Sequence, residues 1–184
     1  MMTPDRNPTI EGADIAHDAD LLGEVLQCYR PVARYLRSMT HRVEGNRVVG
    51  DAELAIEQSC YIDDTGHLNA VDALIGYNQM AYYTIASLVR NSVGPVFGDW
   101  SMADFHRRHL SDMVIADTRF EFRRPVDARR FRAQLVFDSI EPYRSGSAER
   151  IALRTSVAFG NDTLGGCRGD VRVVIVDSAQ LGTR

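Results

Sequence analysis

The sequence predicts an α+β fold in which an antiparallel sheet wraps round one long central helix. Three observations support this prediction. One segment carries apolar residues at three- and four-residue steps, four later segments alternate apolar and polar residues, and turn-forming residues separate the last three of them. A helix that is apolar over so much of its surface must be covered on most sides, and a curved sheet supplies that cover.

The N-terminal part of the chain is expected to be helical after a short leader. Residues 1–14 are polar and acidic, and we expect them to form a flexible leader to one domain over residues 15–184. From Ile15 to about Met39, apolar residues recur at helical spacing, which predicts one or two helical segments. Pro31 interrupts them because proline cannot continue a helix.

A strand and the central helix follow. Residues 46–62 alternate apolar and charged side chains and therefore predict a strand. The helix begins at Asn69, whose side chain can accept a hydrogen bond from the Asp72 amide in the spacing of a capping box. The helix ends before Gly94 and Pro95. Its apolar stripe is formed by Val71, Leu74, Ile75, Ala81, Ile85, Leu88 and Val89.

The remainder of the chain predicts strands after a connection at 99–113 that has some helical character. Turn-forming residues between the last three strands favour hairpins and an antiparallel meander. This order of elements is the layout of a hot-dog fold. Hot-dog subunits usually pair, and their acyl-thioester sites lie at the subunit interface near the start of the helix. The four strands are expected within residues 113–126, 129–140, 149–160 and 169–178.

Composition and charge exclude several classes of function. The 184 residues are 45% hydrophobic with a net charge of −4, which gives no electrostatic footprint for nucleic acid. No apolar run approaches the roughly 20 residues that cross a bilayer, so no membrane contact and a cytoplasmic location are expected. Cys28, Cys60 and Cys167 are odd in number and widely spaced, which argues against a disulfide framework or a zinc site. No metal or cofactor is expected.

Arginine clusters in two places, at residues 106–109 ("HRRH") and at residues 123–132 ("RRPVDARRFR"). Such runs usually form a solvated face. The functional alternative is a docking surface for an acidic partner, or for the phosphates of coenzyme A or of a carrier-protein arm.

The turn before the helix, "DDTGHLNA" (residues 63–70), contains residue types suited to thioester chemistry. Gly66 permits close approach of the backbone, and the unpaired N–H groups behind it can stabilise an oxyanion on a thioester carbonyl. His67 is suited to moving protons at neutral pH, because an unperturbed imidazole has a pKa of about 6.5. The alternatives are that His67 only hydrogen-bonds the loop and that Asn69 is only a helix cap.

Further polar residues lie on the helix or within reach of a pocket beside it. Asn78 falls on the apolar stripe and is expected to be buried with hydrogen-bond partners, and Gln79 adjoins it. Tyr29 and Tyr61 are possible polar contacts in a pocket, although buried tyrosines are commonly part of a core.

The segment "SCYIDDTGHLNAVDALIGYNQMAYY" (residues 59–83) resembles the FcoT-type family of hot-dog proteins. That family carries a similar Tyr-Ile-x-x-Thr-Gly-His run before Asn-Ala-Val and an acidic residue, and then Asn-Gln-x-Ala-Tyr on the helix. Softer matches are "YRPVARYL" at 29–36, the W-S-x-x-D-F pattern at 100–105, the H-L-S-x-M pattern at 109–113 and "FRRPV" at 122–126.

The resemblance implies an acyl-thioester enzyme. Members of the family were first described as long-chain acyl-coenzyme A thioesterases, and related members add glycine to the β-carbon of an α,β-unsaturated acyl thioester on an acyl carrier protein. Family residues proposed near the active site match Tyr29, Tyr61 and Asn69, and hot-dog dehydratases place a catalytic histidine in the turn that carries His67 here. We therefore expect His67, Tyr61 and Asn69 to be catalytic. Substrate contacts are expected from Tyr29, Arg34, Gly66, Asn78, Gln79, Tyr82 and His109.

Two reactions compete on chemical grounds. A hot-dog thioesterase normally needs a carboxylate, for which Asp63, Asp64 and Asp72 are candidates, but the helix begins with Asn69, whose amide cannot act as a base. Conjugate addition of glycine to a (2E)-enoyl thioester needs only a polarised carbonyl and a base such as His67. We therefore expect this addition, giving a β-(carboxymethylamino)acyl thioester. A thioesterase is the first alternative and a non-catalytic acyl-binding protein the second.

The expected partners are an acyl carrier protein or coenzyme A thioester, glycine, and further copies of the chain in a homodimer or higher oligomer. The glycine carboxylate calls for an arginine or several neutral donors. Arg30, Arg34 and the pair Arg107 and Arg108 are candidates, and the sequence does not choose among them.

Overall fold

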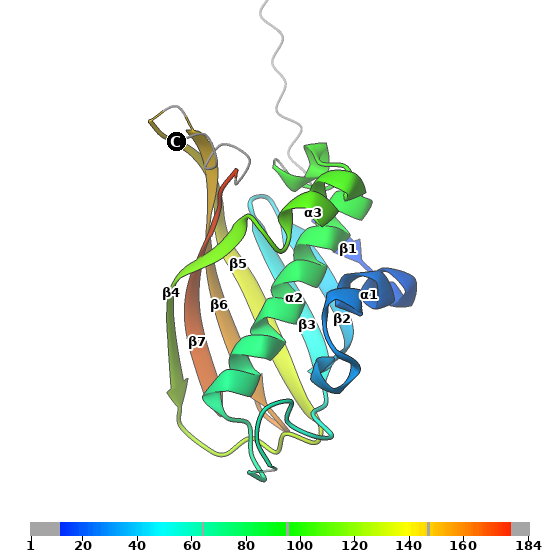
Figure 1. The fold of residues 1–184 in the computed structure, drawn as a ribbon, viewed down its shortest axis with the longest axis vertical. Coiled ribbons are helices and arrows are strands. Elements are labelled where there is room, and N and C mark those ends of the chain that lie inside the picture. Colours follow the sequence, from blue (N-terminus) through cyan, green and yellow to red (C-terminus); the bar gives the residue numbers. More distant parts are fainter. Residues whose placement is uncertain (1–11, 64, 95, 147, 178–184) are drawn as a thin grey trace, which may run out of the picture.

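The fold is an antiparallel sheet that curves round the central helix α2 (Ala70–Arg90), as Figure 1 shows. The computed structural model describes residues 12–177 except 64, 95 and 147. Over these residues the sheet has the strand order β1-β2-β3-β5-β6-β7-β4, and every neighbouring pair is antiparallel. The predicted α+β hot-dog arrangement is confirmed. The strands are β1 (Ala13–Ile15), β2 (Leu36–Glu44), β3 (Arg47–Leu54), β4 (Met113–Phe122), β5 (Phe131–Ser145), β6 (Ala148–Gly160) and β7 (Cys167–Ile175).

Helix α2 forms the centre of the core because apolar side chains occupy most of its circumference. Tyr77, Met80 and Leu88 are completely buried, and each such side chain contributes about 1.5–3 kcal/mol to the stability of the fold. The Tyr77 hydroxyl also shares a hydrogen bond of 2.8 Å with the Thr155 hydroxyl of β6. The sheet therefore holds the helix by apolar burial and by at least one buried polar contact.

The helical region predicted from Ile15 to about Met39 is confirmed in part between Ala19 and Ala33; it is wrong at Ile15, which belongs to β1, and beyond Ala33. Helix α1 (Ala19–Val25) and the 3-10 turns η1 (Leu26–Cys28) and η2 (Pro31–Ala33) lie on one side of α2. From Leu36 the chain is strand β2. A register shift between Leu36 and Ser38 places an extra residue in the strand, so the buried Leu36 and Met39 are three residues apart, which is the spacing of a helix.

The other boundary corrections concern the leader and the first predicted strand. Ala13 and Asp14, assigned to the leader, pair with β2 as part of β1, while residues 1–11 lie outside the described part of the chain. Strand β3 ends at Leu54, so the strand predicted at 46–62 is too long. Beyond it the chain leaves the sheet, and the Ile56 amide bonds the Ala128 carbonyl at 2.9 Å.

The segment after α2 is helical in part, as predicted. It contains the 3-10 turn η3 (Phe97–Asp99) and helix α3 (Met102–Arg108), which begins with a capping box between Ser101 and Asp104. Strands β5, β6 and β7 form the predicted meander, and β4 pairs with β7 at the edge of the sheet. No helix in the described residues is long and apolar enough to span a membrane.

Candidate functional site

Asn69 caps α2 and occupies two of the backbone donors at the start of this helix. Its Oδ1 accepts hydrogen bonds from the amides of Val71 and Asp72, both at 3.0 Å, and from the Tyr61 hydroxyl at 2.7 Å. The predicted cap is confirmed. The Ala70 amide has no acceptor within the described part of the chain, so it is the donor in the first turn that remains available to a ligand.

Asp72 holds Asn69 in this orientation from inside the protein. Asp72 is only 2% exposed, and its Oδ2 accepts a hydrogen bond of 2.6 Å from the Asn69 side-chain amide. Its Oδ1 accepts from the hydroxyls of Tyr35 at 2.8 Å and Ser59 at 3.3 Å. Because the Asp72 carboxylate is buried and hydrogen-bonded on both oxygens, it is not positioned to act as a base on a ligand.

The loop that carries Tyr61 is fastened to the same network. Ser59 donates to Asp72, the Cys60 amide donates to the Tyr35 hydroxyl at 3.2 Å, and Tyr61 donates to Asn69. Burial and the hydrogen bonds with Cys60 and Asp72 raise the pKa of the Tyr35 hydroxyl above its ordinary value, so this hydroxyl stays protonated and remains a donor. Three consecutive loop residues are thereby tied to the start of α2.

His67 lies in the turn between this loop and α2, with an exposed side chain. The Thr65 hydroxyl bonds the backbone carbonyl of His67 at 2.8 Å, but the imidazole makes no hydrogen bond to any described residue. Gly66 has φ of +72°, a left-handed conformation that favours glycine. The turn is therefore shaped by its backbone, and the imidazole is left free to meet a ligand.

A cavity of about 450 Å³ opens at the start of α2 and brings the turn against the segment after β4. The Leu68 amide bonds the Val126 carbonyl at 2.8 Å and fixes these two segments to each other. Phe122 is 43% exposed and supplies an apolar wall. We call this space the helix-start cavity; it is lined by His67, Leu68, Asn69, Ala70, Phe122, Arg123, Arg124 and Pro125.

A second group of predicted site residues gathers halfway along α2. The ring centroid of Tyr82 lies 6.4 Å from that of Tyr29 and 5.7 Å from that of His109. Burial raises the pKa values of both tyrosines, which keeps them as neutral donors, and neither hydroxyl bonds a described residue. Asn78 lies one turn before Tyr82, half-buried, and its amide also has no partner in the described residues, contrary to the prediction.

His109 is held in this group as a neutral ring. It stacks on Phe105 with centroids 4.9 Å apart, and its Nδ1 lies 3.0 Å from the His106 carbonyl. Burial lowers the pKa of His109 below its ordinary value. We assign the proton to Nδ1 because that atom faces a carbonyl, which leaves Nε2 as an acceptor.

The predicted catalytic and substrate-binding residues therefore form two clusters. Asn69 and Tyr82 are about 20 Å apart along α2, given a rise of about 1.5 Å per residue. The helix-start cluster contains Tyr61, Gly66, His67 and Asn69, and the mid-helix cluster contains Tyr29, Asn78, Tyr82 and His109. A stripe formed by Val71, Ile75, Asn78 and Tyr82 links them, and it is only partly covered by the rest of the chain.

Gln79 is placed in neither cluster. Its side chain is completely buried, and its Oε1 accepts from the amides of Tyr35 and Leu36, both at 2.9 Å. Its Nε2 donates to the Ala33 carbonyl at 2.6 Å. All its hydrogen bonds go to the backbone between η2 and β2, so Gln79 fixes the N-terminal segment to α2 and does not face a ligand.

The arginines proposed for glycine binding lie away from the helix-start cavity. Arg34 is half-buried at the level of the mid-helix cluster, where its Nε bonds the Tyr29 carbonyl at 3.1 Å, and Arg30 is the residue before η2. Arg107 pairs with Asp104 at 3.1 Å. The Arg108 guanidinium lies 4.8 Å from the centre of the Trp100 ring.

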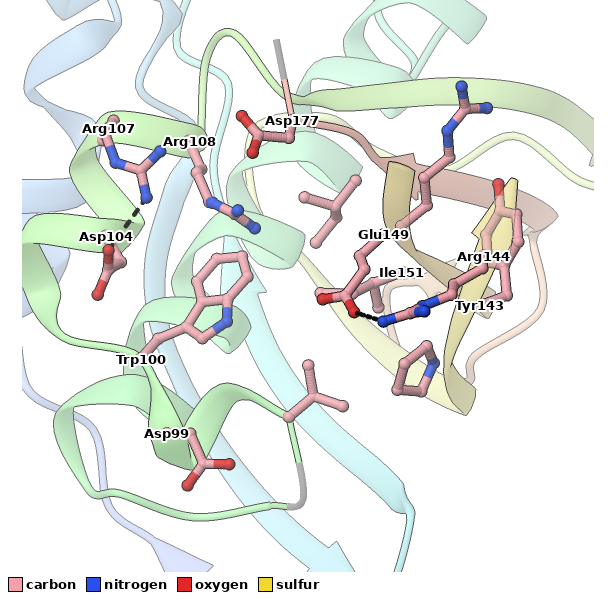
Figure 2. Close-up of a pocket in the computed structure, with 14 residues that line it drawn as sticks. Asp99, Trp100, Asp104, Arg107, Arg108, Tyr143, Arg144, Glu149, Ile151 and Asp177 are labelled. Atoms are coloured by element: carbon pink, nitrogen blue, oxygen red, sulfur yellow. Dashed lines mark hydrogen bonds and ion pairs between the residues drawn. The ribbon is translucent and has the colours of Figure 1, made fainter. Parts of the chain in front are cut away.

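Arg107 and Arg108 instead line a larger cleft of about 1010 Å³ between α3 and the β5–β6 hairpin (Figure 2). On the hairpin side of this cleft, Arg144 of β5 pairs with Glu149 of β6 at 2.7 Å. This cleft is thus lined by charged residues that largely neutralise one another, and it contains none of the predicted site residues except this arginine pair. Sequence reasoning missed Arg123 and Arg124 as site residues, although "FRRPV" was one of the matching motifs.

In the described residues, no group of histidine, cysteine, aspartate and glutamate side chains has the arrangement of a metal site. The three cysteines are free thiols, and burial raises the pKa of Cys167 to about 12. Of the carboxylates considered for hydrolysis, Asp63 is exposed and does not line the helix-start cavity, and Asp64 lies outside the described residues.

Comparison with known proteins gives consistent relationships. A Streptomyces coeruleorubidus protein named (2E)-enoyl-ACP glycyltransferase is 36% identical over 161 residues, which cover 87% of this chain and 98% of that protein. A Mycobacterium marinum protein of the same name is 28% identical over 159 residues, 86% of each chain. A putative thioesterase structure from Shewanella oneidensis aligns with a TM-score of 0.45 and 15% identity, covering 86% of this chain and 99% of that one. A model of the FcoT-like thioesterase domain matches residues 24–175, and the chain therefore belongs to the FcoT-like family.

Proposed function

We propose that the protein adds glycine to the β-carbon of a (2E)-enoyl thioester carried by an acyl carrier protein. The product is a β-(carboxymethylamino)acyl thioester. The observation that carries the proposal is the chemistry of the helix-start cavity. It offers an imidazole and a backbone donor that have no partner among the described residues, and its lining residues include no carboxylate. The relatives named (2E)-enoyl-ACP glycyltransferase support the same reaction.

The proposed reaction begins with polarisation of the thioester carbonyl. The Ala70 amide, at the positive end of α2, donates to the carbonyl oxygen and stabilises the negative charge that moves there from the β-carbon. His67 takes a proton from the glycine ammonium group, and the nitrogen of the resulting neutral amine then forms a bond to the β-carbon as the C=C π bond opens. His67 returns a proton to the α-carbon, so the imidazole ends in its starting state.

Tyr61 and Asn69 contribute in different ways. Tyr61 does not line the helix-start cavity, but its side chain is 50% exposed and therefore accessible, and its hydroxyl donates to Asn69, which does line it. Asn69 orients the first turn of α2 and thereby aims the Ala70 amide. We assign the substrate contact to Tyr61 and the positioning of the donor to Asn69.

The stripe on α2 is the proposed path of the acyl chain. It leads from the helix-start cavity to Tyr29, Asn78, Tyr82 and His109, and it combines apolar side chains with a few unsatisfied polar groups. Such a lining is typical of a ligand site. Arg34 lies near the far end of this path. We therefore assign it to a polar group of the acyl chain and not to glycine.

A second copy of the chain is proposed to cover this path. Val71 on the stripe is 46% exposed, and Val114 on the edge strand β4 is 48% exposed. An edge strand also presents unpaired backbone groups that another copy can pair with. Light scattering after size exclusion tests this proposal, and a monomer at micromolar concentration would contradict it.

The direct test of the reaction uses intact mass. The protein is incubated with a (2E)-enoyl carrier protein, with and without glycine, and the mass of the carrier protein is read. A gain of one glycine supports addition. The description of the family as thioesterase-like keeps hydrolysis as the second candidate, and loss of the acyl group without glycine would support it. No change in mass in either arm would leave acyl binding as the activity.

A further inference from the structure

The proposed reaction requires a binding site for the carboxylate of glycine, and the arginines suggested by the sequence do not supply it. In the transition state the carboxylate is only two bonds from the attacking nitrogen, so its partner must lie beside the reacting β-carbon. Arg34 lies at the level of the mid-helix cluster. Gln79, whose side chain bonds the backbone on both sides of Arg34, is about 15 Å along α2 from the helix start. Arg107 and Arg108 line the cleft at α3.

Two other arginines line the helix-start cavity itself, together with His67 and Ala70. Arg123 is engaged elsewhere, because it pairs with Glu121 at 3.0 Å and also lines a groove shared with residues of β5, β6 and β7. Within the described part of the chain, the Arg124 side chain bonds only the Thr163 hydroxyl, at 3.4 Å. Among the described residues, no carboxylate lies within ion-pair distance of Arg124.

The other arginines of the segment 123–132 are engaged by neighbouring carboxylates or backbone carbonyls. Arg129 pairs with Asp127 at 2.6 Å and Arg130 with Glu53 at 3.3 Å. Arg132 donates to the carbonyls of Asn161 and Asp162. In the described residues, Arg124 and Arg132 thus have no carboxylate partner, and of these two only Arg124 lines the cavity that His67 and Ala70 also line.

We propose that Arg124 is the binding site for the glycine carboxylate. This inference rests on the proposed function and deepens it by naming the residue that selects an amino acid over a simple amine. A guanidinium binds a carboxylate through two parallel hydrogen bonds. These bonds would raise the affinity for glycine and also fix the orientation of its amine. The amine is thereby held between Arg124 and His67, where it can lose its proton and reach the β-carbon.

The test compares nucleophiles in the Arg124→Ala variant. KM for glycine is expected to rise about tenfold or more, because charge-assisted hydrogen bonds are lost. KM for glycinamide, which keeps the amine but lacks the carboxylate, is expected to stay within a factor of two. Arg124→Lys is expected to recover part of the affinity for glycine. Arg130→Ala is the matched control, because Arg130 lies in the same segment outside the cavity.

The outcomes separate this inference from the reaction itself. If the wild-type protein adds no glycine in the mass assay, the proposed function fails and the variants are not needed. If the wild type is active but Arg124→Ala leaves KM for glycine unchanged, or raises it equally for glycinamide, the inference is overturned. An effect confined to KM for the carrier-borne thioester, and absent with a short thioester that has no phosphate, would also overturn it by making Arg124 a phosphate site.

Discussion

The two clusters along α2 differ in how completely their polar groups are satisfied. At the helix start, Asp72 bonds both Asn69 and Tyr35, and the imidazole of His67 and the amide of Ala70 have no partner among the described residues. At mid-helix, the hydroxyls of Tyr29 and Tyr82 bond nothing in the described residues. The arrangement at the helix start suits a reaction in which the catalytic groups must be held in place. The arrangement at mid-helix suits the binding of acyl chains that vary in length and position.

The largest expected effect comes from removing the free imidazole at the helix start. His67→Ala should lower turnover about 100-fold or more, because a positioned acid–base group typically contributes at least that much. Its melting temperature should not change, since the exposed ring makes no hydrogen bond to a described residue. His106→Ala is the control, because that ring bonds Glu24 outside the cavity. Wild-type turnover in His67→Ala would remove this residue from the mechanism.

A second test concerns His41, which supports the middle of α2 rather than its start. His41 is 4% exposed, its Nε2 lies 3.1 Å from the Thr84 hydroxyl, and its Nδ1 is buried without a partner. Burial lowers the pKa of His41 to about 4, against a smaller opposing effect of Asp51. Tyr83 is the aromatic neighbour of the ring, at 5.6 Å between centroids.

The sign of the pH dependence follows from this depressed pKa. Below about pH 6.5 the unfolded chain binds a proton at His41, whereas the folded chain does so only near pH 4. As the pH falls from about 6.5 to about 4, the free energy of unfolding should therefore decrease by up to about 3 kcal/mol. Urea unfolding at several pH values measures it. His41→Asn should flatten the slope in this window, and an unchanged slope would show that other groups control it.

Asp72→Asn tests whether the tied network matters for catalysis. The side-chain NH2 of the new asparagine would face a hydrogen-bond donor, either the Asn69 amide or the hydroxyls of Tyr35 and Ser59. We expect a loss of about 1–3 kcal/mol in stability and a fall in kcat without a matching rise in KM. Tyr35→Phe removes a single hydroxyl from the network and should cost about 1 kcal/mol. Denaturation curves and steady-state kinetics measure both. If Asp72→Asn keeps the wild-type kcat, the network serves stability alone.

The smallest effect is expected at the mid-helix cluster. Tyr82→Phe should raise KM for a long-chain substrate a few-fold and leave stability unchanged, because the hydroxyl has no partner in the described residues. Tyr77→Phe is the matched variant on the same helix, where the buried bond to Thr155 predicts a loss of about 1 kcal/mol and no change in KM. The reverse pattern would show that Tyr82 is structural.

The parts of the fold that depend on local chemistry were predictable from the sequence. The Asn69 cap depends on residues two and three positions away, and the β5–β6–β7 meander depends on turns between adjacent strands. The network behind the cap was not predictable, because Tyr35 and Asp72 are 37 residues apart and meet only in the folded chain. The bulge in β2 was likewise hidden, since it gives a strand the apolar spacing of a helix.

The candidate site was predicted in its composition but not in its layout. The predicted helix already places Asn69 and Tyr82 about 20 Å apart, but the sequence could not show that Tyr29 and His109, from distant segments, gather round Tyr82. Nor could it show that Gln79 faces the backbone between η2 and β2. Arg124 was missed because it lines the same cavity as His67 only after two distant segments meet, as the bond between Leu68 and Val126 shows.

The way Asn69 caps α2 affects which of two reaction intermediates the site can stabilise, the tetrahedral alkoxide of hydrolysis or the enolate of conjugate addition. A tetrahedral alkoxide concentrates a full charge on one atom and is usually met by a pair of donors, whereas a planar thioester enolate spreads the same charge over several atoms. With Val71 and Asp72 already engaged by the cap, the Ala70 amide is the one donor of the first turn without a partner in the described residues. We therefore expect the Asn69 side chain to disfavour hydrolysis before any base is considered.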